Sequence, residues 1–289
     1  METKTKDLFL FLSFYLIAYT AGFFSVFFTS FPLELKFFLF DIIATLVIWI
    51  ISLFIHNSSL YDAYWSLTPM VMLIWLWIIM PQVNVYLIIF STAFFFWSIR
   101  LTINWITTFD GRTWEDWRYK NLRETLNPVL WQIANLFGIM IMPTLLVFLG
   151  FFPIFKLFES ISPLSLVGST IILIGTLLEL FADRDMHSFL KADKVKGVCN
   201  IGLWHYSRHP NYLGEILIWV GVYLAFIKSF PELWYYGAGA LGMILLFEFI
   251  SIPMAEKRQK TRRPDYLSYI RSTSRLLVLP PKEEKKLKH

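Results

Sequence analysis

The stretch Ser207-Arg-His-Pro-Asn-Tyr-Leu-Gly-Glu215 organises this chain, because it ends a polar loop and opens a long apolar run. Pro210 suits the first position of a helix, where its missing N–H removes no hydrogen bond, and Ser207 or His209 is placed to cap that helix. A helix start presents free N–H groups and the positive end of its dipole, so it favours an anion such as phosphate. Arg208 and His209 lie just outside that end, and we therefore expect a binding site here.

Three further side chains of this stretch are expected near the same site. Asn211 and Glu215 are four residues apart and share one face of the expected helix, with Tyr212 beside them. Amide and carboxylate groups can hold the hydroxyl and amide groups of a nucleotide, while the helix start holds its phosphates. The constellation therefore predicts a site and not only a helix boundary.

The composition indicates a membrane protein. Hydrophobic residues make up 56% of the 289 residues and charged residues only 16%, with a mean hydropathy of +0.56. Soluble domains are nearer a quarter charged. Because backbone in lipid must satisfy its own hydrogen bonds, the predicted fold is all-α, a polytopic bundle of transmembrane helices. Cys199 is the only cysteine, which excludes an internal disulfide and a cysteine-built metal site, and no metal is expected.

Apolar stretches long enough to cross a bilayer occur about eight times. They cover residues 8–28, 36–55, 66–80, 85–107, 134–155, 164–182, 211–226 and 233–254. Eight spans place both termini on one side, where the connecting segments hold 22 Lys and Arg, against Lys36, Lys156 and Lys228 on the other side. By the positive-inside rule, both termini are expected on the cytosolic side of the membrane. That membrane is either a bacterial plasma membrane or the endoplasmic reticulum. The net charge of +5 then reflects topology, and the expected partners are membrane lipids and not nucleic acid.

Ionisable residues inside the spans are a second informative class, since they usually mark partners or function. Only Asp41 is expected toward the far side of the membrane. The cytosolic half holds Asp62, Arg100, Glu179, Glu215 and Glu248. This clustering predicts a polar cavity that opens to the cytosol.

The end of the sixth span and the tail can both contribute to such a cavity. Glu179 and Asp183 are four residues apart and give that helix end a polar face, which suits a nucleotide but also fits a solvated helix end. The tail, 253–275, contains Arg258 and Tyr269. It either folds back as a lid that places Arg and Tyr against a nucleotide, or lies as an amphipathic segment on anionic lipid.

The third and fourth spans supply the candidates for chemistry on a substrate. Trp97 and Arg100 lie on roughly one face, and a buried Arg100 needs an anion, either as a structural ion pair or in a catalytic role. Asp62 begins the third span between Tyr61 and Tyr64 and is a candidate proton donor.

The longer stretch Gly202-Leu-Trp-His-Tyr-Ser-Arg-His-Pro-Asn-Tyr-Leu-Gly-Glu215 resembles the steroid 5α-reductase C-terminal superfamily. The likeness covers about residues 61–281 and includes Arg100, Asp183 and Glu256-Lys-Arg258. Isoprenylcysteine carboxyl methyltransferases, phospholipid N-methyltransferases and sterol C14/C7 reductases share a similar Arg-His-Pro-x-Tyr core. Asn followed by Gly-Glu after the proline is more similar to the reductases.

The resemblance implies an NADPH pocket. It implies cofactor contacts for Asn211, Glu215, Glu179 and Asp183, with Arg208, Tyr212 and Arg258 as further candidates, and we add His209 and Tyr269 from their positions. It also divides the chain into a two-span extension, 1–60, and a reductase-like domain, 61–289, with a cytosol-facing cofactor site and a C-terminal tail.

One departure affects the substrate half. The steroid enzymes polarise the enone carbonyl with a Tyr at the position of Trp97 and a Glu near the start of the preceding span. We therefore expect Tyr61, Tyr64 or Asp62 to polarise the carbonyl here, with Arg100 nearby. The leading hypothesis is an NADPH-dependent membrane reductase of a conjugated C=C bond in a steroid-like, isoprenoid or other lipid. The alternatives are a membrane methyltransferase that uses S-adenosylmethionine, and a non-catalytic lipid binder.

Overall fold

The computed structural model of the chain describes residues 2–192 and 197–282. Within these ranges all regular structure is helical, apart from one isolated bridge between Ser207 and Ser274. The predicted all-α fold is therefore confirmed for the part of the chain that the structure describes.

Eight of the described helical segments are long and apolar enough to cross a membrane, as the sequence predicts. They are Lys4–Phe27, Leu33–Ile55, Ser58–Ile79, Val85–Thr108, Pro128–Glu159, Ser165–Lys191, Pro210–Ile227 and Pro231–Arg262. Each overlaps one expected span, and several are longer because polar helix ends continue beyond the apolar part. The chain is an integral multi-pass membrane protein, and the cytosolic position of its termini stays a prediction.

The helices group into two compact units. Unit 1 comprises Met1–Leu87 and Ser98–Ile161, and unit 2 comprises Ile88–Trp97 and Ser162–His289. The expected division at residue 60 came from a family likeness, and this grouping by compactness does not test it.

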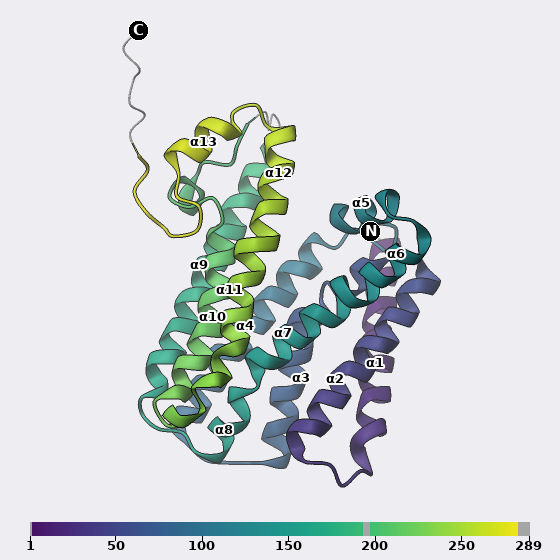
Figure 1. The fold of residues 1–289 in the computed structure, drawn as a ribbon, viewed down its shortest axis with the longest axis vertical. Helices are drawn as coiled ribbons and strands as arrows, with labels where there is room; N and C mark the ends of the chain where they lie inside the picture. The colour runs from purple at the N-terminus through teal and green to yellow at the C-terminus, as the bar shows by residue number, and fades with distance from the viewer. Residues whose placement is uncertain (1, 193–196, 283–289) are drawn as a thin grey trace. The chain divides into compact units, whose positions relative to one another are not determined.

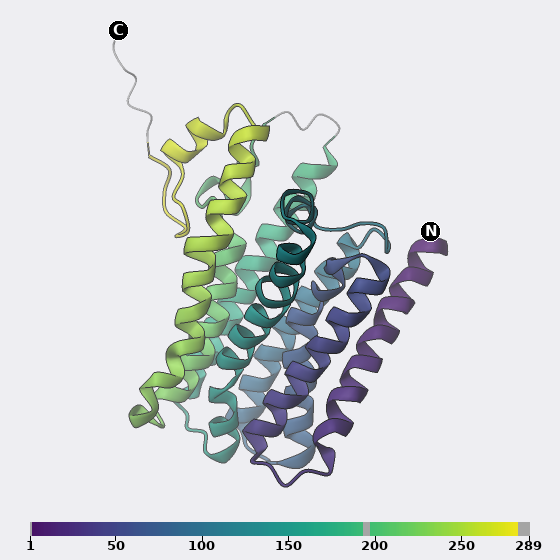
Figure 2. The ribbon, with the colours of Figure 1, turned by 45° about the vertical axis from the view of Figure 1, so that its right-hand side comes forward.

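The first two helices of unit 1, α1 and α2, pack closely against each other. Gly22 lets α1 approach α2 closely, because a Cβ at this glycine would lie 2.6 Å from the Phe40 carbonyl oxygen. Figures 1 and 2 show these two helices side by side. The elements of the unit are α1 (Glu2–Phe27), α2 (Leu33–Ile55), the 3-10 turn η1 (Ser58–Tyr61), α3 (Tyr64–Ile79), the second part of α4 (Val85–Thr108), α5 (Trp117–Thr125), α6 (Pro128–Ile133), the π-helical η2 (Ala134–Ile141), α7 (Met142–Phe151) and α8 (Pro153–Glu159).

Unit 2 is organised by two helices that pair through glycines, α9 (Ser165–Lys191) and α10 (Pro210–Ile227). A Cβ at Gly168 would lie 2.2 Å from the Gly221 carbonyl oxygen, and one at Gly175 would lie 2.6 Å from that of Gly214. Small residues hold membrane helices together because they let the backbones touch. The remaining elements are η3 (Gly202–His205), η4 (Pro231–Gly237), α11 (Ala238–Leu246), the π-helical η5 (Phe247–Ser251), α12 (Ile252–Arg262) and α13 (Tyr266–Ser272).

Candidate functional site

The site begins at the first turn of α10, where Pro210 occupies the first helical position as predicted. His209 is the N-cap residue, but its side chain makes no capping hydrogen bond, so the expected His209 cap is wrong. The Ser207 hydroxyl is also not a helix cap, since it accepts from the His209 N–H at 3.2 Å and donates to the Leu276 carbonyl at 2.7 Å. The side chain of the N-cap residue therefore does not cap the first turn of α10.

Arg208 ties the start of α10 to the tail. Its Nε donates to Glu256 Oε1 at 2.9 Å, and its Nη1 donates to the carbonyl oxygens of Ile270 at 3.0 Å and Thr273 at 2.8 Å. The side chain is only 8% exposed. Glu256 matches its charge and backbone carbonyls accept from Nη1, so Arg208 clamps the tail to the start of α10 while it also lines the cavity described below. This arrangement gives no support to the phosphate contact expected of it.

His209 contributes an aromatic face and not a charge. Its ring stacks on that of Tyr212, with centroids 5.4 Å apart and planes at 4°, and its Nε2 lies 3.3 Å from Glu256 Oε1. Burial lowers the pKa of His209 from its ordinary value of 6.5, although the hydrogen bond with Glu256 acts in the opposite direction. The imidazole is therefore neutral at pH 7.

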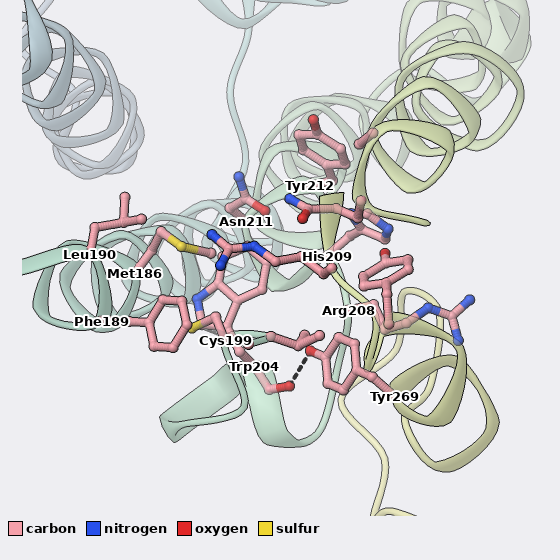
Figure 3. A pocket seen from close by; sticks show the side chains of 16 residues that line it. Met186, Phe189, Leu190, Cys199, Trp204, Arg208, His209, Asn211, Tyr212 and Tyr269 are labelled. Atoms are coloured by element: carbon pink, nitrogen blue, oxygen red, sulfur yellow. Dashed lines mark hydrogen bonds between the residues drawn. The ribbon is translucent and has the colours of Figure 1, made fainter. Parts of the chain in front are cut away.

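A cavity of about 220 Å³ opens beside this helix start (Figure 3). Its walls come from the end of α9, the loop that precedes α10, the first turn of α10, α12, Arg263 and α13. The lining residues are Met186, Phe189, Leu190, Gly197, Val198, Cys199, Trp204, Arg208, His209, Asn211, Tyr212, Ala255, Gln259, Arg263, Tyr266 and Tyr269. Five of the nine predicted cofactor residues are therefore gathered around one cavity: Arg208, His209, Asn211, Tyr212 and Tyr269.

The cavity has one apolar side. Met186, Phe189 and Leu190 project from α9, with Cys199 and Trp204 beside them (Figure 3). Burial raises the pKa of Cys199 to about 11, so this thiol stays protonated and is not a nucleophile. This side of the cavity suits the flat face of a base or another weakly polar group.

Asn211 supplies the open polar group. Its half-buried side chain lines the cavity, and no residue in the ranges 2–192 and 197–282 forms a hydrogen bond with it. A carboxamide offers two donor hydrogens and one acceptor oxygen. Together with the uncapped helix start, Asn211 gives the cavity unused hydrogen-bonding capacity.

The tail folds back over the cavity, which agrees with the first of the two interpretations of its sequence. The Tyr269 hydroxyl donates to the Trp204 carbonyl (Figure 3) and to that of Ser207 at 3.3 Å. Tyr266 lines the cavity beside it, and burial raises the pKa of both tyrosines above the ordinary value. Sequence reasoning missed Tyr266, although Tyr266 and Tyr269 are three residues apart and so share one helix face.

Glu215 does not line this cavity. Its Oε1 accepts from the Trp219 indole N–H at 3.0 Å, and its Oε2 accepts from the Trp97 indole N–H at 3.0 Å. It is 5% exposed. Trp97, the residue that departs from the steroid enzymes, is therefore a partner of Glu215 within unit 2.

The other predicted carboxylates and Arg258 also lie away from the cavity lining. Glu179 is 3% exposed and packs against α10, where a Cβ at Gly214 would lie 2.4 Å from its side chain. Asp183 and Arg258 are half-buried. The close helix pairing turns the polar face of α9 toward α10, which the spacing of the carboxylates alone does not reveal.

The candidate residues for substrate chemistry lie in a cluster of buried tyrosines in unit 1. The Tyr64 hydroxyl donates to Asp41 Oδ1 at 2.8 Å, and its ring stacks on that of Tyr61 with centroids 5.2 Å apart. The Tyr61 hydroxyl shares a hydrogen bond of 2.7 Å with Thr144, which shares one of 2.9 Å with Thr45. Asp41, expected toward the far side of the membrane, is thus the direct partner of Tyr64.

Asp62 and Arg100 belong to the same unit. Asp62 Oδ1 accepts from the Tyr119 hydroxyl at 2.9 Å. Arg100 is 7% exposed in α4. A signal for Asp41 was present in the sequence, since an acidic residue in an apolar span marks function by default.

Comparisons with known proteins place most of the chain in one family. Residues 48–273 match the family described as DUF1295, a protein of unknown function. An uncharacterized protein of Schizosaccharomyces pombe is 24% identical over 252 residues, which cover 77% of this chain and 73% of the relative. No solved structure matches the chain.

Proposed function

The chain belongs to the DUF1295 family, and we propose that it is an integral membrane reductase that uses NADPH to reduce the conjugated C=C bond of an enone. The substrate class is a steroid-like, isoprenoid or other lipid. The proposal is supported by the likeness of the 202–215 stretch to reductases and by the cavity that forms around it.

The single observation that carries the proposal is the unused hydrogen-bonding capacity at the start of α10. The Asn211 side chain has no hydrogen-bond partner among the described residues, and the side chain of the N-cap residue His209 does not cap the helix. An uncapped helix start favours phosphate, and an amide favours a ribose hydroxyl or a carboxamide. Both groups open on one cavity.

The residues present fit one end of NADPH. The cavity of about 220 Å³ is smaller than the roughly 300–1,000 Å³ of pockets that enclose a whole drug-sized ligand. A phosphate and the adjoining ribose at Asn211 and the helix start, with a base against Trp204 and Phe189, would fill it. Arg208 and Glu215 are excluded from this set because their polar groups already bind other parts of the chain.

NADPH, when bound, supplies a hydride to the β-carbon of the enone. The protein polarises the carbonyl and delivers a proton to the α-carbon, which completes the addition of two hydrogens across the C=C bond. Tyr64 is one candidate for polarising the carbonyl, but its single hydroxyl hydrogen is donated to Asp41 at 2.8 Å, so it would have to exchange that partner for the substrate. Tyr61 and Asp62 are the alternatives, held by Thr144 and Tyr119.

The experiment follows NADPH oxidation by the protein in lipid nanodiscs against a panel of enone lipids. We expect Tyr64→Phe to reduce kcat at least tenfold with the Kd for NADPH unchanged, as for the loss of one donor that acts in the transition state. Tyr61→Phe and Asp62→Asn test the alternatives. Tyr223→Phe is the matched control, because the Tyr223 hydroxyl donates to the Trp234 carbonyl and Tyr223 does not line the cavity.

Two outcomes would overturn the proposal. Binding of S-adenosylmethionine without binding of NADPH would assign a methyltransferase. Binding of neither nucleotide, with lipid binding retained, would assign a non-catalytic lipid binder.

A further inference from the structure

Unit 1 contains a second cavity, of about 600 Å³, that the proposed reductase chemistry does not use. It is lined by the last turn of α2, η1, the end of α5, α6 and the beginning of η2. None of its ten lining residues is acidic, and they include Arg123, His56, Gln132 and Asn135. Its size lies within the range of roughly 300–1,000 Å³ for small-molecule sites.

Asn135 forms the inner wall with its amide nitrogen unused. The residue is 2% exposed, and its Oδ1 accepts from the Ser58 hydroxyl at 2.9 Å. No residue in the ranges 2–192 and 197–282 accepts a hydrogen bond from its Nδ2. Asn135 lines the cavity, so its amide nitrogen can donate to a ligand there.

The rim of the cavity also consists mainly of donors. Arg123 lies over the Trp131 ring at 5.0 Å, and its Nη1 donates to the His56 carbonyl at 3.2 Å. Its Nη2 donates to Glu115, which leaves its Nε without a partner in the described part of the chain. The Gln132 amide likewise makes no hydrogen bond within the described ranges. The ligand must therefore be rich in acceptor oxygens.

The backbone has uncommon conformations on two sides of the cavity. His56 has φ of 54°, in the left-handed region that non-glycine residues seldom adopt, and this turn directs its carbonyl onto Arg123. The chain changes from α to π winding at Ala134, next to Asn135. Such π segments occur often at functional sites.

The cavity lies where two candidate membrane spans end, which is where the membrane surface is expected. It lies at the ends of two candidate spans, Leu33–Ile55 and Pro128–Glu159. Phe54 is 80% exposed and Val129 is 70% exposed beside it, as expected of side chains that face acyl chains. α5 carries Arg118 and Lys120 as well as Arg123, and such basic segments attract the anionic head groups of lipids.

We propose that this cavity binds the phosphate group of an anionic membrane phospholipid, with the acyl chains along the apolar ends of α2 and α6. The amide of Asn135, the amide of Gln132 and the guanidinium of Arg123 are the donors to the phosphate oxygens. The Arg123 charge is already paired with Glu115 at 2.6 Å, so its Nε supplies a hydrogen bond beside those of the two neutral amides.

The test titrates the delipidated full-length protein in detergent with dioctanoyl phosphatidylglycerol and measures bound lipid by native mass spectrometry. Asn135→Asp retains the acceptor for Ser58 and replaces the donor with an oxygen, so we expect affinity to fall at least tenfold. Gln132→Leu lies at the exposed rim, where it cannot disturb the core, and should weaken binding severalfold. Asn121→Leu, an exposed change on α5 outside the cavity lining, is the matched control.

Binding of three ligands is compared: the phospholipid, dioctanoylglycerol and inorganic phosphate. Dioctanoylglycerol, which lacks the phosphate, should bind far more weakly than the phospholipid, and so should inorganic phosphate. Equal binding of dioctanoylglycerol would overturn phosphate recognition, and equal binding of inorganic phosphate would overturn the lipid occupant. Unchanged phospholipid affinity in both Asn135→Asp and Gln132→Leu would overturn the site itself.

Discussion

The start of α10 in unit 2 and the tyrosine cluster in unit 1 gather polar side chains in opposite ways. In the cluster, the hydroxyls of Tyr61 and Tyr64 are both bonded to neighbouring side chains. At the start of α10, Asn211 has no partner in the described part of the chain and lies on a cavity. The difference shows which groups are occupied by folding and which are available to a ligand.

The same distinction divides the 207–215 stretch itself. Arg208 and Glu215 are the charged residues that a sequence reader assigns first to a cofactor, yet both are buried and bonded within the protein. A buried charge is strongly destabilising unless it is paired, so the fold uses these residues before a ligand can. Asn211, which carries no charge, is the one left open.

The largest expected effect is that of Arg208→Met. It removes the three side-chain hydrogen bonds between Arg208 and the tail and leaves Glu256 without its guanidinium partner. We expect a loss of about 3–5 kcal/mol in the free energy of unfolding, as for a broken buried pair. Thermal unfolding in detergent measures the loss, and trypsin cleavage at Arg271 should become faster.

Arg184→Met is the matched control for this change, since the Arg184 side chain is 67% exposed on α9. If the Arg208→Met protein is stable but no longer binds NADPH, Arg208 is a cofactor contact. That result would contradict the assignment of Arg208 to folding.

Glu215→Leu should have the second largest effect. It leaves the indole N–H groups of Trp97 and Trp219 without an acceptor, at about 1–3 kcal/mol for each unsatisfied group. Adding Trp97→Phe should recover part of the loss, which a double-mutant cycle of unfolding free energies detects. NADPH affinity of the folded protein should not change, and its disappearance would place Glu215 in the cofactor site after all.

Tyr64→Phe tests the other region. Asp41 then loses the hydroxyl donor to its Oδ1, and we expect the free energy of unfolding to fall by about 1–3 kcal/mol. Tyr223→Phe, measured in the same thermal unfolding series, should be nearly neutral. If the two variants are equally stable, the cluster is not satisfied in the way its hydrogen bonds indicate.

The smallest effect is a pH dependence from His209. Because burial lowers its pKa in the folded protein below 6.5, the unfolded chain binds more protons as the pH falls through this value. Stability is therefore fully present above that pH and declines below it, until the folded histidine is protonated as well. His209→Asn should flatten the curve of melting temperature against pH from about 5 to 8, and a parallel curve would contradict the burial effect.

The parts that could be predicted from sequence are those that depend on local composition. Lipid requires helices, so apolar length alone gave the spans, and Pro210 marked the start of α10. The partners of Arg208 are backbone carbonyls more than sixty positions later, at Ile270 and Thr273, and no spacing rule reaches them. The pairing of Tyr64 with Asp41 likewise depends on how α2 and α3 pack.

The most direct test of the central claim is a titration of NADPH into the detergent-purified protein, with Asn211→Ala beside Asn200→Ala. Asn200 is an exposed asparagine of the preceding loop that does not line the cavity. We expect a dissociation constant about tenfold higher for Asn211→Ala, with an unchanged value for Asn200→Ala and unchanged melting temperatures for both. Equal affinity of both variants for NADPH, or no NADPH binding by the wild-type protein, would contradict it.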